Sequence, residues 1–157
     1  MQTFSRVQRN ISDQTTLTTL LSLLGLLLLY PSMAAVYPLL PPLLGIVYVK
    51  WREAFYRQDY LRLVVWMTYA VIVESVWSLP LYGVWTVMLV TFTVFDPKIT
   101  YLLRTPGSIN VVSVVVFDLL YLLFLYGYGH LTHTKVIETD LILLYYFLVD
   151  IVGVILF

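Results

Sequence analysis

The sequence predicts an all-α, polytopic membrane protein built as one six-helix bundle. Of its 157 residues, 61% are hydrophobic and only 11% are charged, whereas a soluble domain carries about 25% charged residues. The mean hydropathy is +0.89, and long apolar runs alternate with short polar stretches. A chain so poor in charge cannot cover a water-facing surface, so lipid is expected to be its main solvent.

Composition also excludes several function classes. The formal net charge is zero, which gives no reason to expect nucleic acid as a partner. The absence of cysteine removes disulfides, thiolate chemistry and sulfur metal ligands. No nucleophile with its base, phosphate-binding loop or zinc-protease motif occurs, so neither an enzyme nor a cofactor is expected. The polar start, 1–16, is expected to precede a retained first helix rather than a signal peptide.

Six apolar segments divide the chain, because a membrane-spanning helix needs about 20 mostly apolar residues. The third and fourth form a helical hairpin around a short hinge at 78–83, and no Lys or Arg occurs from Leu63 to Phe95. The expected crossings, in one domain of 1–157, are residues 17–35, 36–49, 63–79, 83–95, 109–126 and 141–157.

The second segment is unusual because it carries three prolines, Pro38, Pro41 and Pro42. Each proline lacks a backbone donor and disfavours helix at the residue before it. We therefore expect a broken approach followed by a short helix, Leu43 to Trp51, inside the bundle or shallow at its outer face. Whether 36–49 crosses completely is left open by the sequence.

The cations predict an orientation. With six crossings, eight of the nine basic residues fall on one side and Lys135 falls on the other. The positive-inside rule then places both termini in the cytoplasm. The first basic connection, 50–62, is expected to mark topology at an anionic lipid surface, with partner docking as the alternative. Its cations are Lys50, Arg52, Arg57 and Arg62.

Three acids lie within apolar segments that contain no Lys or Arg: Glu74, Asp118 and Asp150. A charged carboxylate in hydrocarbon costs about 2.5–3.5 kcal/mol on insertion scales. Each acid is therefore expected to be a neutral group bonded between helices, part of a proton or ion path, or a contact for a partner. The expected donors are Ser75 and Ser78 for Glu74, Tyr121 for Asp118, and Tyr145 and Tyr146 for Asp150.

Two histidines, His130 and His133, are spaced by three residues in the polar stretch 127–140, before Glu138 and Asp140. A zinc site could be drawn from these side chains. Two histidines without a fixed third ligand favour a solvated loop instead, so no metal site is predicted.

The hinge resembles that of the MreD family, small bacterial inner-membrane proteins of the rod-shape system. Glu74 resembles the acid of the family's third helix, and Ser78, Pro80 and Gly83 resemble its hinge. The proline-bearing stretch 37–40, followed by a basic loop, also resembles the family's second segment. This chain has Glu where Asp is usual, and its spacing from Pro to Gly is one residue longer.

The resemblance implies a non-catalytic component of the cell-wall elongation machinery, with six crossings and both termini inside. Its partners would be the bitopic protein MreC and, through it, the RodA glycosyltransferase and its transpeptidase. The fold is also similar to the substrate-binding subunits of energy-coupling-factor vitamin transporters. That alternative places a ligand among Trp66, Trp77, Trp85 and Glu74. A third alternative is a proton- or ion-coupled subunit that uses the three buried acids.

Overall fold

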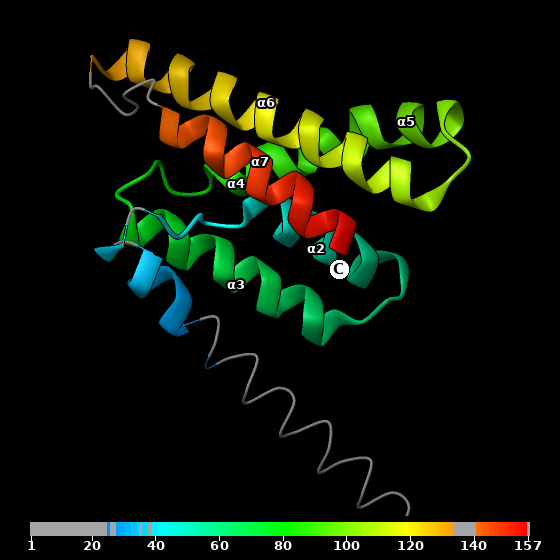
Figure 1. Ribbon diagram of the computed structural model, residues 1–157, viewed down its shortest axis with the longest axis horizontal. Coiled ribbons are helices and arrows are strands. Elements are labelled where there is room, and N and C mark those ends of the chain that lie inside the picture. The colour runs from blue at the N-terminus through cyan, green and yellow to red at the C-terminus, as the bar shows by residue number, and fades with distance from the viewer. Residues whose placement is uncertain (1–24, 26–27, 35, 38, 134–140, 157) are drawn as a thin grey trace, which may run out of the picture.

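The computed structural model describes residues 25, 28–34, 36–37, 39–133 and 141–156, and over these residues the fold is entirely helical (Figure 1). The predicted all-α class is therefore confirmed for the described part of the chain. Residues 28–34 are helical, but most of the predicted first crossing, 17–35, lies outside the described residues. The later elements are α2 (Leu44–Tyr56), α3 (Tyr60–Val76), α4 (Gly83–Val90), the π-helical η1 (Thr91–Phe95), α5 (Asp96–Leu102), α6 (Pro106–Thr132) and α7 (Leu141–Leu156).

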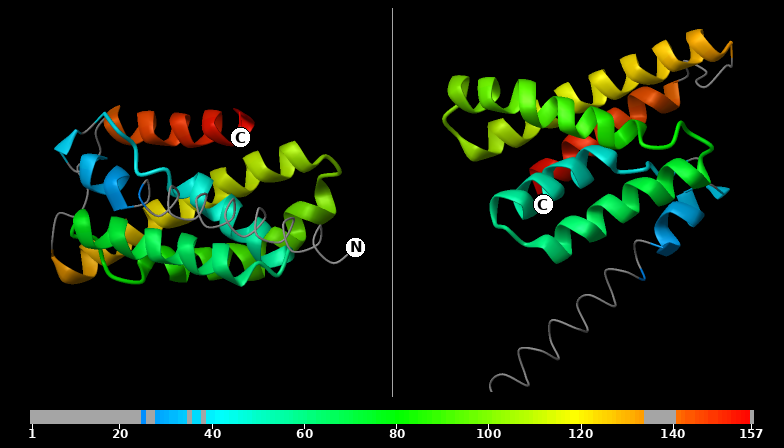
Figure 2. Two further views of the ribbon diagram at one scale, coloured as in Figure 1. Left: turned by 90° about the horizontal axis from the view of Figure 1, so that it is seen from below. Right: turned by 180° about the vertical axis from the view of Figure 1, so that it is seen from behind.

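Helices α2 and α3 run antiparallel, α4, η1 and α5 then run in one direction as a continuous stretch, and α6 and α7 run antiparallel beside them (Figures 1 and 2). One end, which we call the basic end, holds residues 50–62 and 96–110 together with the C-terminal end of α7 (Figure 1). The other, the hinge end, holds 77–82 and the C-terminal end of α6. The two basic connections that the sequence predicts on one side thus lie at one end of the fold.

Helix α2 forms the centre of the bundle, where it packs against α3, α6 and α7. The ring of its Tyr48 is fully buried and stacks on Phe117 of α6 at 5.0 Å between centroids. The preceding Leu43 has a left-handed backbone with φ of 53°, so no helix continues back into the prolines. The predicted broken approach and buried short helix are both observed.

Hydroxyl groups from neighbouring segments bind the carbonyls of the proline stretch. Tyr30 Oη donates to the Pro41 carbonyl at 2.8 Å, and Tyr69 Oη donates to the Pro42 carbonyl at 2.8 Å. A backbone that leaves the helix inside a bundle must find such partners, because unpaired buried carbonyls are costly.

The observed ends of three helices differ from those that the sequence predicted. Helix α2 continues to Tyr56 instead of ending at Trp51, so much of the predicted basic loop is helical. The fourth segment does not end at residue 95 but continues through η1 into α5. Helix α6 reaches Thr132, so the predicted polar connection 127–140 begins later than expected; residues 134–140 lie outside the described part.

The outer surface of the described bundle carries many large apolar side chains, such as Leu119 and Leu123 on α6. Within the described residues, one stretch is long and apolar enough to cross a membrane: Gly107–Thr132, with a mean hydropathy of 2.2. Leu144–Leu156 is a shorter apolar helix. The fold therefore offers one clear candidate span.

Candidate functional site

The acid of the hinge, Glu74, is fully buried and bonded to the start of the next helix. Its Oε2 accepts the Tyr82 N–H at 2.7 Å, and its Oε1 accepts the Val84 N–H at 2.5 Å. Tyr82 is the N-cap residue of α4 and Val84 lies in its first turn, where the N–H groups have no partner within the helix. Glu74 therefore caps α4 from the end of α3.

The donors to Glu74 are not the ones expected from the sequence. Ser75 Oγ donates to the Val71 carbonyl at 2.8 Å, one turn back in its own helix. Ser78 is exposed and has a left-handed backbone with φ of 52°, which turns the chain out of α3. Backbone amides from across the hinge supply the bonds instead.

Pro80 and Gly83 complete the hinge. The Gly83 N–H donates to the Pro80 carbonyl at 3.1 Å, which closes the turn before α4. A Cβ at Gly83 would lie 2.6 Å from Phe124 Cε1 of α6, so only glycine allows α4 to approach α6 this closely. The four residues of the family-like motif thus form one structural unit that joins α3 to α4.

The other two predicted acids, Asp118 and Asp150, lie on α6 and α7, two helices that pack against each other. Asp150 Oδ2 accepts the Gly45 N–H at 2.9 Å, at the N-terminus of α2. Asp150 Oδ1 and Asp118 Oδ2 are buried and have no hydrogen-bond partner among the described residues. The donor to Asp150 from α2 was not predicted from the sequence.

A buried ionic cluster lies at the basic end, centred on Arg52 and Asp96, which are 8% and 1% exposed. Arg52 Nη1 lies 3.1 and 3.2 Å from the two oxygens of Asp96 and donates to Ser113 Oγ at 2.7 Å. Ser113 Oγ donates in turn to Asp96 Oδ1 at 2.9 Å. Arg52 Nη2 donates to Asn110 Oδ1. This cluster fastens α2, α5 and α6 together.

The π-helical turn explains why Asp96 points inward. Thr91 and Asp96 are five residues apart and both buried, which matches the i to i+5 spacing of a π-helix. The following Pro97 has no N–H, so the helix loses one bond there without leaving a donor unpaired. An uninterrupted α-helix would bring residue 95, rather than Asp96, back to the face of Thr91.

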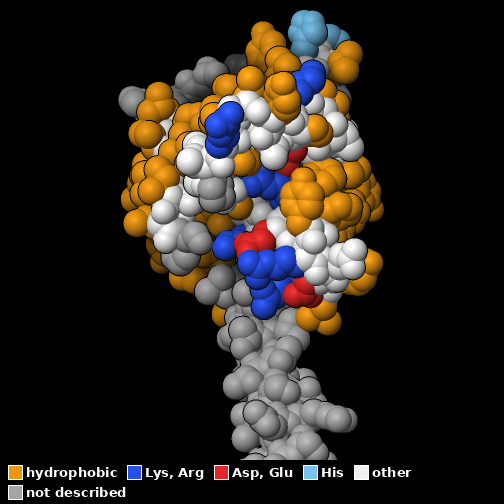
Figure 3. All heavy atoms as spheres, turned by 90° about the vertical axis from the view of Figure 1, so that its right-hand side faces the viewer, with side chains coloured by type: hydrophobic (Ala, Val, Ile, Leu, Met, Phe, Trp, Pro, Cys, Tyr) orange, Lys and Arg blue, Asp and Glu red, His pale blue; other side chains and the backbone are white. Residues whose placement is uncertain are grey.

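The other cations of the predicted loop are more exposed. Glu53 is shared by two of them: Lys50 Nζ lies 3.5 Å from its Oε2 and Arg57 Nη2 lies 2.7 Å from its Oε1. Arg62 Nε pairs with Asp59 Oδ2 at 3.1 Å. Figure 3, which turns the basic end toward the viewer, shows Lys and Arg side chains around a hollow on this face of the molecule.

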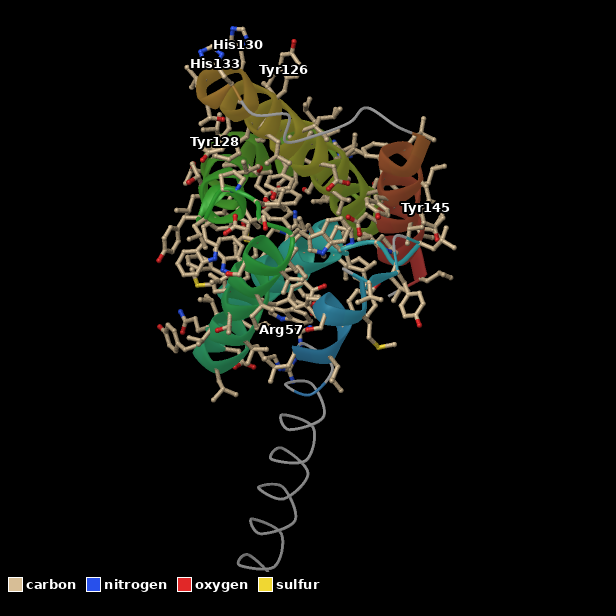
Figure 4. The ribbon with its side chains drawn as sticks, turned by 90° about the vertical axis from the view of Figure 1, so that its left-hand side faces the viewer. Arg57, Tyr126, Tyr128, His130, His133 and Tyr145 are labelled. Carbon is tan, nitrogen blue, oxygen red and sulfur yellow. The ribbon has the colours of Figure 1, made fainter. Side chains whose placement is uncertain are left out.

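Two tryptophans of the alternative ligand site bond to or pack against residues outside that site, and the two histidines are exposed. His130 and His133 are exposed and point outward at the far end of α6 (Figure 4). Trp85 Nε1 donates to the Met67 carbonyl at 3.2 Å, and Trp77 packs edge-on against Tyr146. Among the described residues, no three His, Asp or Glu side chains gather to hold a metal.

Asp96, Ser113 and Asn110 are the functional candidates that sequence reasoning missed. Asp96 stands directly before Pro97, a pair typical of turns, and Ser113 is small enough to pass as a packing residue. The sequence did contain one signal, which is the position of Arg52 only three residues after the apolar Val49. An arginine buried at that position would need a carboxylate partner.

Comparison of the chain with protein-family models, with curated proteins and with solved structures finds no match. The resemblance to MreD therefore remains a prediction that rests on the hinge residues.

Proposed function

We propose that this chain is a non-catalytic, multi-pass membrane component of the bacterial cell-wall elongation machinery, which binds a bitopic MreC-like partner. In this proposal it crosses the inner membrane six times with both termini in the cytoplasm. The basic end faces the cytoplasm and the hinge end faces outward.

The membrane placement is supported by the surface of the fold. Large apolar side chains are exposed along the outer helices, including Leu123 at 67% and Ile155 at 67%. The cations of 50–62 and 96–110 occupy one end, which fits the retention of Lys and Arg on the cytoplasmic side. Helix α6 supplies the clearest span, and the antiparallel helices beside it would cross with it.

The assignment to a non-catalytic assembly component rests on the hydrogen bonds of the Glu74 carboxylate. Both oxygens of its carboxylate bind backbone amides of α4, so the acid of the family-like motif holds the hairpin together. Because these bonds hold α3 and α4 in a fixed arrangement, the outer faces of the two helices are suited to rigid contact with a partner protein. This bonding also weighs against the vitamin-binding alternative, which needs this carboxylate for a ligand.

Site-directed photo-crosslinking in the native host would test the proposal. A photoreactive amino acid would replace Leu119 or Leu123 on the exposed face of α6, with the buried Phe117 as the matched control. We expect the exposed positions to cross-link to the host's MreC-like bitopic protein, and depletion of the chain to make rod-shaped cells round. Normal shape after depletion, without any such cross-link, would contradict the proposal.

A second candidate, a proton- or ion-coupled subunit, is favoured by Asp118 and Asp150. Each has a buried carboxylate oxygen without a hydrogen-bond partner among the described residues, and the helices that carry the two acids, α6 and α7, pack against each other. Amide substitution tests this candidate in the same cells. If Asp118→Asn and Asp150→Asn both support normal growth and shape, no coupling role remains for the pair.

A further inference from the structure

The two connections at the basic end differ in how their cations are bonded. Every cation of 50–62 has a carboxylate partner within the fold: Arg52 pairs with Asp96, Lys50 and Arg57 pair with Glu53, and Arg62 pairs with Asp59. Lys98 and Arg104, in the second connection, are exposed. Neither of them forms an ion pair with a carboxylate of the described residues. The cations that remain available for an outside partner at this end therefore lie at 98–104.

Helix α5 presents large apolar side chains on the same face as Lys98. Tyr101 and Leu102 follow Lys98 by three and four positions, which places the three side chains on one side of the helix. Tyr101 is 89% exposed and Leu102 is 75% exposed. The opposite face, with Asp96 and Ile99, is buried. The outer face of α5 is therefore basic and apolar at once.

The position of α5 places this face at the end of a membrane crossing, and here the inference rests on the proposed membrane placement. Helices α4, η1 and α5 follow one another without a break from Gly83 to Leu102. A helical stretch of this length matches the roughly 20 residues that a crossing needs. The next residue, Leu103, has an extended backbone, so the helix ends there. In the proposed orientation, α5 thus lies at the level of the cytoplasmic headgroups.

We propose that the outer face of α5 binds the anionic lipids of the cytoplasmic leaflet. Their headgroup phosphates contact Lys98 and Arg104, while Tyr101 and Leu102 lie at the boundary of the acyl chains. Lys and Arg close to a membrane attract anionic headgroups. Tyrosine is enriched at this depth because its ring is apolar and its hydroxyl is polar.

This proposal moves a role that the sequence analysis gave to the first basic connection. The cations of 50–62 were expected to meet the anionic surface, but they are bonded to carboxylates of the fold. An acidic protein partner is the alternative occupant of 98–104. Such a partner would have to displace lipid from Tyr101 and Leu102, so the two apolar side chains favour the lipid.

Lipid-selective quenching tests the proposal on the full-length chain in phosphatidylcholine nanodiscs. Because the chain contains no cysteine, Gly107→Cys provides a single site for a bimane label, three residues after Arg104. Nothing lies within 4 Å of the Cβ position of Gly107, so the substitution fits. The quenchers are phosphatidylglycerol and phosphatidylcholine that carry the same spin-labelled chain. We expect phosphatidylglycerol to associate at least about fivefold more strongly, the factor that one cation near an anionic surface contributes.

Two double variants with the same number of lost charges show which cations matter. Lys98→Gln/Arg104→Gln should reduce the preference for phosphatidylglycerol to less than about twofold. Arg57→Gln/Arg62→Gln removes two cations that already have carboxylate partners and should leave the preference unchanged. All four side chains are exposed, so both variants are expected to fold.

A third label, at Leu123→Cys on the exposed face of α6, reports whether the bundle lies in the bilayer. Both spin-labelled lipids should quench this label.

The outcomes that would overturn the proposal are distinct. Equal association of the two lipids at Gly107→Cys, or an equal loss of preference in the two double variants, would overturn it while quenching at Leu123→Cys leaves the membrane placement intact. If the lipids associate equally and Lys98→Gln/Arg104→Gln weakens cross-linking to the MreC-like partner in cells, the two cations serve an acidic protein instead. Absence of quenching at Leu123→Cys by either lipid would contradict the proposed membrane placement itself.

Discussion

Arg52 Nη1 on α2 lies 3.1 Å from Asp96 Oδ1 on α5, although 44 positions separate the two residues. Ser113 of α6 bonds to both side chains, so this one ion pair connects three helices. Removing one member of a buried pair leaves a charge without its counterion, at a cost of about 3–5 kcal/mol. The cluster is therefore expected to stabilise the basic end strongly.

Arg52→Met should lower the free energy of unfolding by about 3–5 kcal/mol, because Asp96 would remain buried without its cation. Asp96→Asn should have a similar effect, and the double variant should recover part of the loss since neither charge remains. Unfolding by increasing mole fractions of dodecyl sulfate, followed by tryptophan fluorescence, measures each value.

The matched control is the exposed pair of Arg57 with Glu53. Arg57→Gln should change the free energy of unfolding by less than about 1 kcal/mol, as is usual for surface ion pairs. Single-variant losses at Arg52 and Asp96 that simply add in the double variant would show that the two side chains are not coupled.

Glu74→Ala should loosen the hinge, because the amides of Tyr82 and Val84 lose their acceptor. A buried donor left without a partner costs about 1–3 kcal/mol. Glu74→Gln keeps one acceptor oxygen and should lose less. Hydrogen exchange reports this directly: the Val84 amide should exchange faster in Glu74→Ala, whereas Ser75→Ala, with its exposed hydroxyl, should leave the exchange rate unaltered.

Gly45→Val should destabilise the contact of α2 with α6 and α7. Even a Cβ at Gly45 would lie 2.6 Å from Val114 Cγ1 and 3.1 Å from Asp150 Oδ2, and overpacking of this kind costs about 1–3 kcal/mol. The added Val114→Ala change should restore part of the thermal stability. Gly127→Ala is the control, since nothing lies within 4 Å of its Cβ position; a matching loss there would argue against the steric explanation.

The hydropathy pattern predicted the helical class and the position of the hairpin, because both depend on local sequence. The prolines likewise predicted the broken approach to α2, since proline restricts the backbone wherever it stands. The position of the hinge between the third and fourth segments was predicted correctly, but the hydrogen bonds within it were not predicted. Glu74 binds backbone amides, which carry no sequence signal.

The site at the basic end was not predictable in the same way. Arg52 follows an apolar segment closely, and cations in that position usually mark topology at the membrane surface. Its burial depends on Asp96, which is distant in sequence and is turned inward by a π-helical turn. A single sequence does not identify which distant carboxylate pairs with Arg52, and it contains no signal for that change of helical spacing.

The orientation of the proposed bundle can be tested with single cysteines, because the natural chain contains none. Arg57→Cys and Arg104→Cys place thiols at exposed positions of the basic end, and His130→Cys places one at the opposite end of α6. In intact spheroplasts, a membrane-impermeant maleimide should label His130→Cys alone. Labelling of all three after lysis shows that each thiol is reachable.

Two other patterns would contradict the proposed topology in different ways. Labelling of Arg57→Cys or Arg104→Cys in intact spheroplasts would turn the basic end outward, against the retention of cations inside. If all three thiols react fully before lysis, the two ends of α6 are not separated by a bilayer, and the apolar surface of the bundle must instead be covered by protein.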